Sequence, residues 1–401
     1  MNRVAIRIVV IAVFAALCVE AHAADAPSED VPRVSYELQL DTIRSGYDGE
    51  TCWVHARAGA IPAEPPIVVL TMQKLLLSGS DVFFALNEMR SDDFGVTWTD
   101  PVEHDTLGRR AIEDGAVEVV CDFAPKWHAA TGKILGTGHS AQYRDNKLVS
   151  VRTRCTAYSV YDPENRTWTP WKGMEMPDDE RFYNAGAGCT QRIDLPNGDI
   201  LLPVYFKAMG EKQYAVTVLR CRFDGQTLSY IEHGNELTVA VQRGFAEPSL
   251  ALCNGRYFLT LRNDEAGYVT SGSDGLHFDE PVKWRFDDGE ELGSYNTQQH
   301  WVVHNDALFL VYTRRGLNND HVFRHRAPLV MAQVDPHRLC VLRDTERVLV
   351  PERGARLGNF GVVEIGAAET WVTVTEWMQP AGCEKYGSDN SVYAARIRWN
   401  D

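Results

Sequence analysis

The stretch that most constrains the fold is a turn motif at residues 91–98, which reads Ser-Asp-Asp-Phe-Gly-Val-Thr-Trp. In this S-x-D-x-G-x-T-W pattern, the carboxylate of Asp93 can accept hydrogen bonds from turn amides, and the glycine tolerates a positive φ. The final tryptophan can then anchor the turn in an apolar layer. A weaker copy at 271–278 keeps the Ser, Gly and aromatic spacing but has Ser273 at the Asp position. Two copies 180 residues apart indicate a structural repeat.

Short apolar or alternating segments, rich in Val, Ile, Thr, Tyr and Phe, recur between Asp-Gly, Asn-Gly and Pro turn signals along the chain. No persuasive helical periodicity occurs after the N-terminal apolar run, so the pattern predicts an all-β protein. The segments group into six clusters, near 53–100, 117–171, 188–231, 245–286, 298–349 and 358–399. We expect a single domain over 34–401, folded as a six-bladed β-propeller, in which 34–42 completes a blade shared with the C-terminus. A large β-sandwich is the competing architecture.

The N-terminus has the pattern of a secretory signal peptide over residues 1–23. A basic start is followed by a short apolar run and by Ala21-His22-Ala23, a small-residue cleavage site. Residues 24–33 are expected to be a mobile lead-in. The sequence therefore predicts a secreted or periplasmic protein without a membrane anchor, because no later apolar run approaches 18 residues.

The chain is strongly acidic, with a formal net charge of −15. Loss of Arg3, Arg7 and Glu20 with the signal peptide would bring it to −16. This charge argues against nucleic acid as a partner, and an anionic ligand would need basic groups gathered locally. Eight cysteines follow the cleavage site, but no C-x-x-C pair or zinc-ligand spacing occurs. Disulfides and buried free thiols are equally compatible with this pattern, and neither a metal nor a cofactor is indicated.

Together with the turn motifs, the placement of several charged residues resembles that of sialidases. Arg57 lies in an Arg-Ala-Gly-Ala-Ile-Pro segment, a loosened form of the family's R-I-P motif, and Asp81 follows 24 residues later. Glu247-Pro248 precedes Arg262 in an E-P…G-R…R pattern. The resemblance implies that Arg57, Arg262 and Arg315 hold a substrate carboxylate, that Asp81 is the acid/base, and that Glu247 orients or activates a partner group. Convergent guanidinium groups suit this task because they bind carboxylates in bidentate geometry.

The chain departs from the family at the nucleophile. Sialidases use a Tyr in the final blade, whereas the matching segment here, 357–364, has Phe360. A phenyl ring has no nucleophilic oxygen. Tyr295 and Tyr386 are possible replacements, although neither lies in a recognisable motif.

A second set of residues suits β-elimination from a uronic acid. Arg192 would neutralise the carboxylate and acidify the C5 proton, and His139 and Tyr183 would remove that proton and protonate the leaving oxygen. The arrangement resembles that of propeller polysaccharide lyases in outline only. The alternative is that these residues have structural roles, with a histidine bonded to backbone at the end of a strand.

Polar residues beside Trp301 predict a sugar-binding rim formed by Gln299, His300 and Arg314, because sugars need amide and guanidinium partners and a stacking face. A solvated loop is the alternative. The sequence thus predicts a sialidase-like glycoside hydrolase for a glycan with an acidic terminal sugar. A His/Tyr polysaccharide lyase and a non-catalytic glycan-binding propeller are the alternatives. No sequence feature indicates an oligomeric state.

Overall fold

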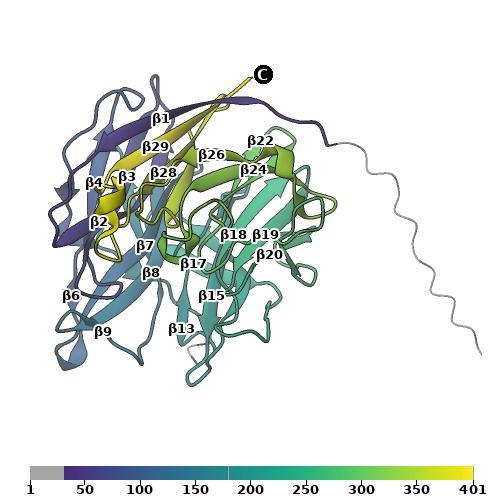
Figure 1. Cartoon of the computed structure of the whole chain (residues 1–401). Coiled ribbons are helices and arrows are strands. Elements are labelled where there is room, and N and C mark those ends of the chain that lie inside the picture. The colour runs from purple at the N-terminus through teal and green to yellow at the C-terminus, as the bar shows by residue number, and fades with distance from the viewer. Residues whose placement is uncertain (1–30, 179, 401) are drawn as a thin grey trace, which may run out of the picture. The chain divides into compact units, whose positions relative to one another are not determined.

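The computed structural model describes residues 31–178 and 180–400, and this part of the chain is built of antiparallel strands with five short 3-10 helices (Figure 1). The expected signal peptide and most of the expected lead-in lie outside the described residues. Among the described residues, no helix has the length and apolar character needed to cross a membrane. The 3-10 helices are η1 (Asp105–Leu107), η2 (Glu113–Gly115), η3 (Phe323–His325), η4 (Arg343–Thr345) and η5 (Cys383–Tyr386).

Five sheets are each formed by one continuous stretch of chain. The first contains β2 (Thr51–Ile61), β3 (Ile67–Leu76), β4 (Phe83–Ser91) and β5 (Val102–Glu103). The second contains β6 (Arg110–Ala111), β7 (Val117–His128), β8 (Lys133–Arg144), β9 (Lys147–Leu148), β10 (Thr156–Asp162), β11 (Thr167–Trp168) and β12 (Lys172–Gly173). The third contains β13 (Asn184–Gly186), β14 (Ile193–Asp194), β15 (Asp199–Lys207), β16 (Ala215–Phe223) and β17 (Leu228–His233). The fourth contains β18 (Ala246–Cys253), β19 (Arg256–Arg262), β20 (Gly267–Gly272) and β21 (Val282–Lys283). The fifth contains β22 (His300–His304), β23 (Ala307–Tyr312), β24 (Leu329–Asp335), β25 (Cys340–Val341) and β26 (Arg347–Val350).

A further sheet joins the two ends of the described chain. It contains β27 (Phe360–Glu364), β28 (Glu369–Thr375), β29 (Val392–Trp399) and, on its outer edge, β1 (Tyr36–Arg44). The purple β1 and the yellow β29 lie side by side in Figure 1, with Tyr36 opposite Trp399. The all-β propeller class is therefore confirmed. The count of six blades needs correction, because five blades are found, and the sixth sheet is a composite of distant segments.

Hydrogen bonds link the six sheets into a closed ring through their first strands and the residues beside them. In blade order the links are His55 to Asp122 (3.0 Å), Cys189 to Asp122 (2.8 Å), Leu250 to Gln191 (3.1 Å), Ser249 to His300 (2.6 Å), Gln298 to Phe360 (2.5 Å) and Arg57 to Phe360 (3.3 Å). The first strands therefore converge on one region, which six distant parts of the sequence share.

The strand register separates two ends of the sheets. In the first blade Thr51, at the start of β2, lies opposite Leu76, so the loop after β3 lies at the end where the first strand begins. The same holds for every sheet, and we call this end the loop end. Its loops, which connect the second and third long strands, are 77–82, 145–155, 208–214, 263–266, 313–328 and 376–391.

The opposite end, which we call the turn end, carries the motif at 91–98. Asp93 accepts hydrogen bonds from the amide of Thr97 (2.8 Å) and from the Ser91 hydroxyl (2.9 Å), as the sequence predicts. Gly95 has φ 82°, and a Cβ there would lie 2.5 Å from the Trp371 ring, so no other residue fits without a shift.

The other four continuous blades have a related turn at the end of the third long strand. In each, one Asp carboxylate accepts the amides two and three residues further on, at distances of 2.7–3.2 Å. The four residues are Asp162, Asp224, Asp274 and Asp335. The structural repeat is thus wider than the two sequence matches, because Asp274 replaces the carboxylate missing at Ser273.

Apolar side chains fill the space between neighbouring sheets, where they remove hydrocarbon from water and hold the blades together. Between the second and third blades, for example, Leu135, Ile200 and Phe206 are fully buried. All eight cysteines after residue 31 are free thiols, so the question of disulfides is settled for the described chain. A core of this size needs no covalent cross-links.

Candidate functional site

Five non-glycine residues with left-handed backbone lie in or beside the first strands, one in each continuous blade. They are His55 (φ 58°), Asp122 (φ 52°), Cys189 (φ 56°), Glu247 (φ 46°) and Asn296 (φ 54°). Three of them interrupt the strand register as β-bulges, which turn a side chain out of the normal alternation. Such conformations are strained in non-glycine residues and cluster at functional sites. Here they turn polar side chains toward the region where the blades converge.

Asp122 is the centre of the first group of polar contacts. Its carboxylate lies 3.0 Å from His55 Nε2 and 3.5 Å from His139 Nε2, and it accepts a hydrogen bond of 2.8 Å from the Cys189 thiol. Burial opposes its ionisation, but the neighbouring His55, His139 and Arg57 hold the pKa of Asp122 well below its usual value. Burial also lowers the pKa of His55 to about 4 and that of His139 to about 3. The group therefore holds one negative charge beside two neutral imidazoles at neutral pH.

Arg57 lies next to this carboxylate on β2 and is 2% exposed. Its Nη2 donates to Gln298 Oε1 (2.9 Å) and to Cys189 Sγ (3.0 Å), and lies 3.7 Å from Asp122. Its Nη1 is buried and has no hydrogen-bond partner. A buried N–H without an acceptor is costly, at about 1–3 kcal/mol. Nη1 of Arg57 is thus a buried donor that lacks an acceptor among the described residues.

Glu247 and Arg262, the two residues of the E-P…G-R…R pattern, form the second group. They make a close ion pair, and Arg262 Nη2 also donates to Asn296 Oδ1 at 2.8 Å. Burial lowers the pKa of Arg262, but Glu247 and Asp264 outweigh it and raise the pKa overall. The Nε of Arg262 is buried without a partner.

A third arginine beside this pair is Arg326, which the sequence analysis missed. It is 5% exposed and donates to the backbone carbonyl of Asn296 and, at 3.4 Å, to Asn359 Oδ1. Burial, together with the charges of Arg262 and Arg356, lowers its pKa well below the usual arginine value. Its Nε is also unpartnered, and no carboxylate among the described residues pairs with it. We call Arg57, Arg262, Arg326, Asp122, Cys189, Glu247 and Asn296 the axial cluster.

Arg315, predicted to be the third carboxylate-binding arginine, lies elsewhere. Its guanidinium stacks on the ring of Tyr295, 4.5 Å from the ring centre. The predicted strand ends at Tyr312, so Arg314 and Arg315 fall in the loop 313–328 rather than on a strand. Arg326 comes back to the cluster at the end of the same loop.

Asp81 lies at the loop end, on the turn after β3, with an exposed side chain and φ 53°. Its backbone carbonyl accepts a hydrogen bond from the Tyr143 hydroxyl (2.7 Å). Burial lowers the pKa of Arg356 to about 10, and the charge of Asp81 acts in the opposite direction, so the carboxylate is close enough to influence that guanidinium.

In the segment matched to the family's nucleophile, the side chain of residue 359, and not that of residue 360, reaches the axial cluster. Phe360 is fully buried and its ring packs on His300, with 5.0 Å between ring centres. The neighbouring Asn359 is the side chain that reaches the cluster, through Arg326 and, at 3.8 Å, the Cys189 sulfur. The Tyr205 hydroxyl lies 3.5 Å from Nδ1 of His139, whose Nε2 is 3.5 Å from the Asp122 carboxylate of the cluster. Its pKa is raised by burial.

The set proposed for elimination is not brought together. Arg192 donates to Asp194 (2.9 Å) and to the carbonyls of Leu135 (2.6 Å) and Lys126 (3.0 Å), so its guanidinium has a structural role between blades. Tyr183 makes no side-chain contact with His139. Instead, His139 lies beside Tyr205, whose ring is covered by the guanidinium of Arg154 at 4.1 Å. A His, a Tyr and an Arg do meet here, but two of the three differ from the predicted residues.

The predicted sugar rim is buried within the fold instead. Gln299 bonds to Thr260 (2.8 Å) and Ser294 (2.9 Å), and His300 is 2% exposed beneath the cluster. Arg314 pairs with Glu346 at 2.7 Å. Gln299 and His300 are buried among other strands and Arg314 is half-buried in the loop 313–328, so the three residues do not form an exposed rim.

One group of possible metal ligands occurs among the described residues. Cys121, Asp122 and His139 offer ligand atoms within 4.8 Å of one another. Burial raises the pKa of Cys121 well above its usual value, which disfavours the thiolate that a metal needs. These residues therefore do not fit a metal site.

No protein-family model matches the chain, and no curated protein is significantly similar in sequence. Solved structures define the class of fold as a sialidase-like β-propeller. Hadza microbial sialidase Hz136 aligns over 89% of this chain and 68% of its own, with TM-score 0.61 and 13% identity. Trypanosoma rangeli sialidase aligns over 91% of this chain and 60% of its own (TM-score 0.57, 13% identity). A protein of unknown function from Dyadobacter fermentans DSM 18053 is covered to 99% (90% of this chain, TM-score 0.57, 14% identity).

Proposed function

We propose that this protein acts on glycans with an acidic terminal sugar, and that Arg57, Arg262 and Arg326 hold the sugar carboxylate. The observation that carries the proposal is that each of these buried guanidiniums has an N–H without an acceptor. A carboxylate offers two oxygens with about four acceptor sites, which matches this number of donors. The sialidase-like fold supports the assignment, and a Trypanosoma rangeli sialidase of this fold is known in complex with sialic acid.

In the proposed reaction Asp81 is the acid that protonates the glycosidic oxygen. It lies on an exposed turn at the loop end, where a departing sugar chain would lie. Glu247 fixes Arg262 and adds negative charge near the developing positive charge of the sugar ring. Asn359 and Phe360 supply no nucleophile, so we propose Tyr205 for this role, with His139 Nδ1, 3.5 Å from its hydroxyl, as the acceptor of the phenol proton.

The test uses the purified protein with oligosaccharides that end in sialic acid or in a uronic acid. We expect release of the saturated terminal sugar, and loss of at least 100-fold in kcat/KM in Asp81→Asn and in Arg57→Ala. Arg315→Ala removes an arginine stacked outside the cluster and serves as the matched control, with activity unchanged. Binding without any release, with affinity lost only in Arg57→Ala, would mean that the protein is a glycan-binding propeller.

Elimination is the second candidate, because His139, Tyr205 and Arg154 lie together. Arg154 would bind the uronate, and the histidine and tyrosine would transfer the protons. This reaction leaves an unsaturated uronate that absorbs ultraviolet light, whereas hydrolysis does not. If Asp81→Asn forms a product with this absorbance and His139→Ala does not, the reaction is elimination, and the hydrolase proposal is wrong.

A further inference from the structure

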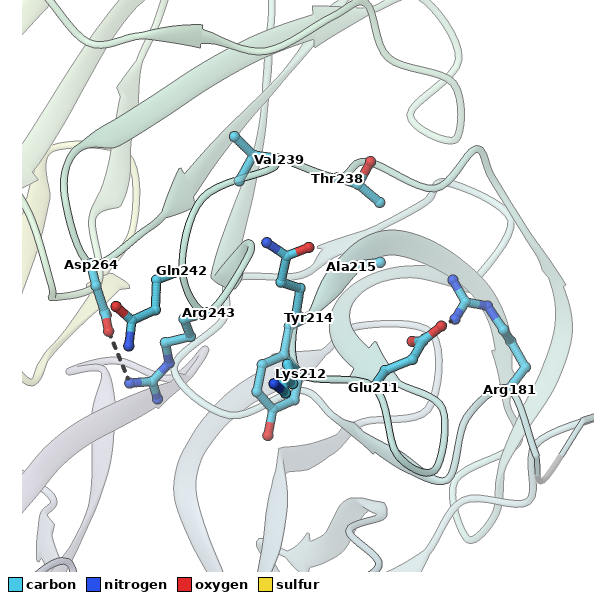
Figure 2. A pocket seen from close by; sticks show the side chains of 11 residues that line it. Arg181, Glu211, Lys212, Tyr214, Ala215, Thr238, Val239, Gln242, Arg243 and Asp264 are labelled. Atoms are coloured by element: carbon cyan, nitrogen blue, oxygen red, sulfur yellow. Dashed lines mark hydrogen bonds and ion pairs between the residues drawn. The ribbon is translucent and has the colours of Figure 1, made fainter.

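A cavity of ≈ 830 Å³ opens at the loop end beside the axial cluster. It is formed by the loop 208–214, by residues that precede β18, and by Asp264 of the next blade. Figure 2 shows Asp264 directed at Arg243 on one side of Tyr214, and Glu211 and Arg181 on the opposite side.

Several basic side chains lie close to the ring of Tyr214. Lys207 Nζ lies 4.8 Å and the Arg154 guanidinium 5.1 Å from its ring centre. Burial raises the pKa of this phenol, but the charges of Arg154, Lys207, Arg243 and Arg152 outweigh it and lower the pKa overall.

The donors of this group are as poorly satisfied as those of the axial cluster. The Nε atoms of Arg152, Arg154 and Arg243 are all buried without a hydrogen-bond partner, and Arg154 is 7% exposed. No described carboxylate lies within ion-pair distance of Arg152, Arg154 or Lys207. In a chain with a net charge of −15, three cations near one phenol that no described carboxylate pairs with, beside Arg243, which shares Asp264 with Arg262, point to a missing anion.

Arg181 does not belong to this set, because Glu211 (3.1 Å) and Glu236 already pair with it. The acid that faces these cations is Asp264. It lies between the Tyr214 cavity and the axial cluster. Its Oδ2 lies 3.7 Å from Arg243, and its Oδ1 lies 3.4 Å from Arg262 of the axial cluster. One carboxylate thus separates the two groups of unpartnered guanidinium donors.

We propose that the Tyr214 cavity is a second anion subsite, so that the preferred ligand is an oligosaccharide with an acidic group on the sugar next to its acidic terminal sugar. This inference rests on the proposed function, because it places the terminal carboxylate in the axial cluster. The second group is a carboxylate or a sulfate, held by Arg243 on the cavity wall, while Arg154, Arg152 and Lys207, which lie around Tyr214 rather than on that wall, add positive charge. The Tyr214 ring provides the apolar face against which the second sugar packs.

The test compares matched oligosaccharides that differ only in this second group. The probes are sialyllactose, its 6-sulfate on the galactose, and a diuronate with its reduced mono-acid. We expect the doubly acidic member of a pair to bind at least 10-fold more tightly, and Arg243→Gln to remove that preference while sialyllactose binding is unchanged. Arg181→Gln, in the same cavity but already paired with acids, keeps the preference. A sulfate advantage without a diuronate advantage assigns the site to sulfate.

Equal affinity for both members of each pair, or a preference that survives Arg243→Gln, would overturn the second subsite. Failure of every probe to bind would contradict the proposed function, and a direct measurement then decides the subsite. The phenol titration of Tyr214, taken as the absorbance difference from Tyr214→Phe, is followed with and without inorganic sulfate. We expect sulfate to raise the midpoint, because a bound anion repels the phenolate, and to do so only when Arg243 is present. An unchanged midpoint would overturn the inference.

Discussion

The turn end and the axial cluster treat polar groups in opposite ways. At the turn end, Asp162, Asp224, Asp274 and Asp335 each accept two backbone amides, so that every donor finds its acceptor. In the axial cluster, Arg57, Arg262 and Arg326 each keep an N–H without an acceptor. Left-handed non-glycine backbone occurs in both regions, at four residues of the axial cluster and in turns such as Phe94 and Arg166, so the regions differ in how their polar groups are satisfied.

The difference indicates that the two regions contribute differently to the free energy of unfolding. Satisfied carboxylates stabilise turns, and their loss affects folding. Unsatisfied guanidiniums and strained backbone lower the stability of the protein in exchange for a preformed binding site. Changes in the axial cluster should therefore alter function more than stability, and changes at the turn end should do the reverse.

Acid titration should separate the two regions, with the largest effect on stability. Burial lowers the pKa of His55 to about 4, and those of His139 and His300 to about 3, from the ordinary 6.5. Below pH 6.5 the unfolded state therefore binds more protons, and the free energy of unfolding falls as pH decreases. We expect a loss of about 2 kcal/mol for each histidine at pH 4.5.

Denaturant unfolding measured from pH 7 to pH 4.5 checks this expectation, and His139→Gln should reduce the slope by about one third. Turn carboxylates whose pKa is lowered contribute little in this window. The pKa of Asp162, for example, is lowered from 3.8 to about 2 by hydrogen bonds to Lys133 and to backbone amides, so its contribution is lost only below pH 3.8. A stability that stays constant between pH 6.5 and 4.5 would show that these histidines are not buried and neutral.

Arg326→Met is the sharpest test of the trade between binding and stability. The substitution removes a buried charge that no carboxylate compensates and whose pKa is already lowered. We expect affinity for the acidic glycan to fall about 100-fold, which is about 2.7 kcal/mol, while the free energy of unfolding stays the same or rises. Calorimetric binding and denaturant unfolding of the same sample measure both quantities.

Arg192→Met is the matched control for this variant, because all three of its donor nitrogens are bonded. It should destabilise the protein by about 3 kcal/mol and leave the half-buried Asp194 without its ion-pair partner, with ligand affinity unchanged. If Arg326→Met destabilises as much as Arg192→Met, the axial arginines are structural and the comparison fails.

These two arginines also show what the sequence can predict. The turn at 91–98 depends on local spacing and has the hydrogen bonds that the sequence predicts, and the sequence pattern that singled out Glu247 and Arg262 contains two residues that form an ion pair. Arg326 returns to the cluster through a long loop, and its position depends on the packing of 313–328, which no local pattern encodes.

The predictions for site residues on strands were incomplete for a different reason. Asp122 acts in the cluster because a β-bulge turns it there, and a bulge has no reliable sequence signal. The prediction at Phe360 identified the correct segment, but side chains alternate along a strand. The group that reaches the cluster is thus the adjacent Asn359.

The smallest expected effect lies at the turn end, and it tests the other half of the comparison. Asp335 accepts the amides of His337 (2.9 Å) and Arg338 (3.0 Å) in a buried position at the end of β24. Asp335→Ala removes both acceptors and should lower the free energy of unfolding by about 1–2 kcal/mol. Asp335→Asn keeps one acceptor oxygen and should lose less than half of that. Neither variant should change glycan affinity, because the turn lies at the end of the sheets opposite to the arginines. A loss of affinity in Asp335→Ala that Asp335→Asn restores would show that the turns position the axial cluster, and that the two ends are not independent.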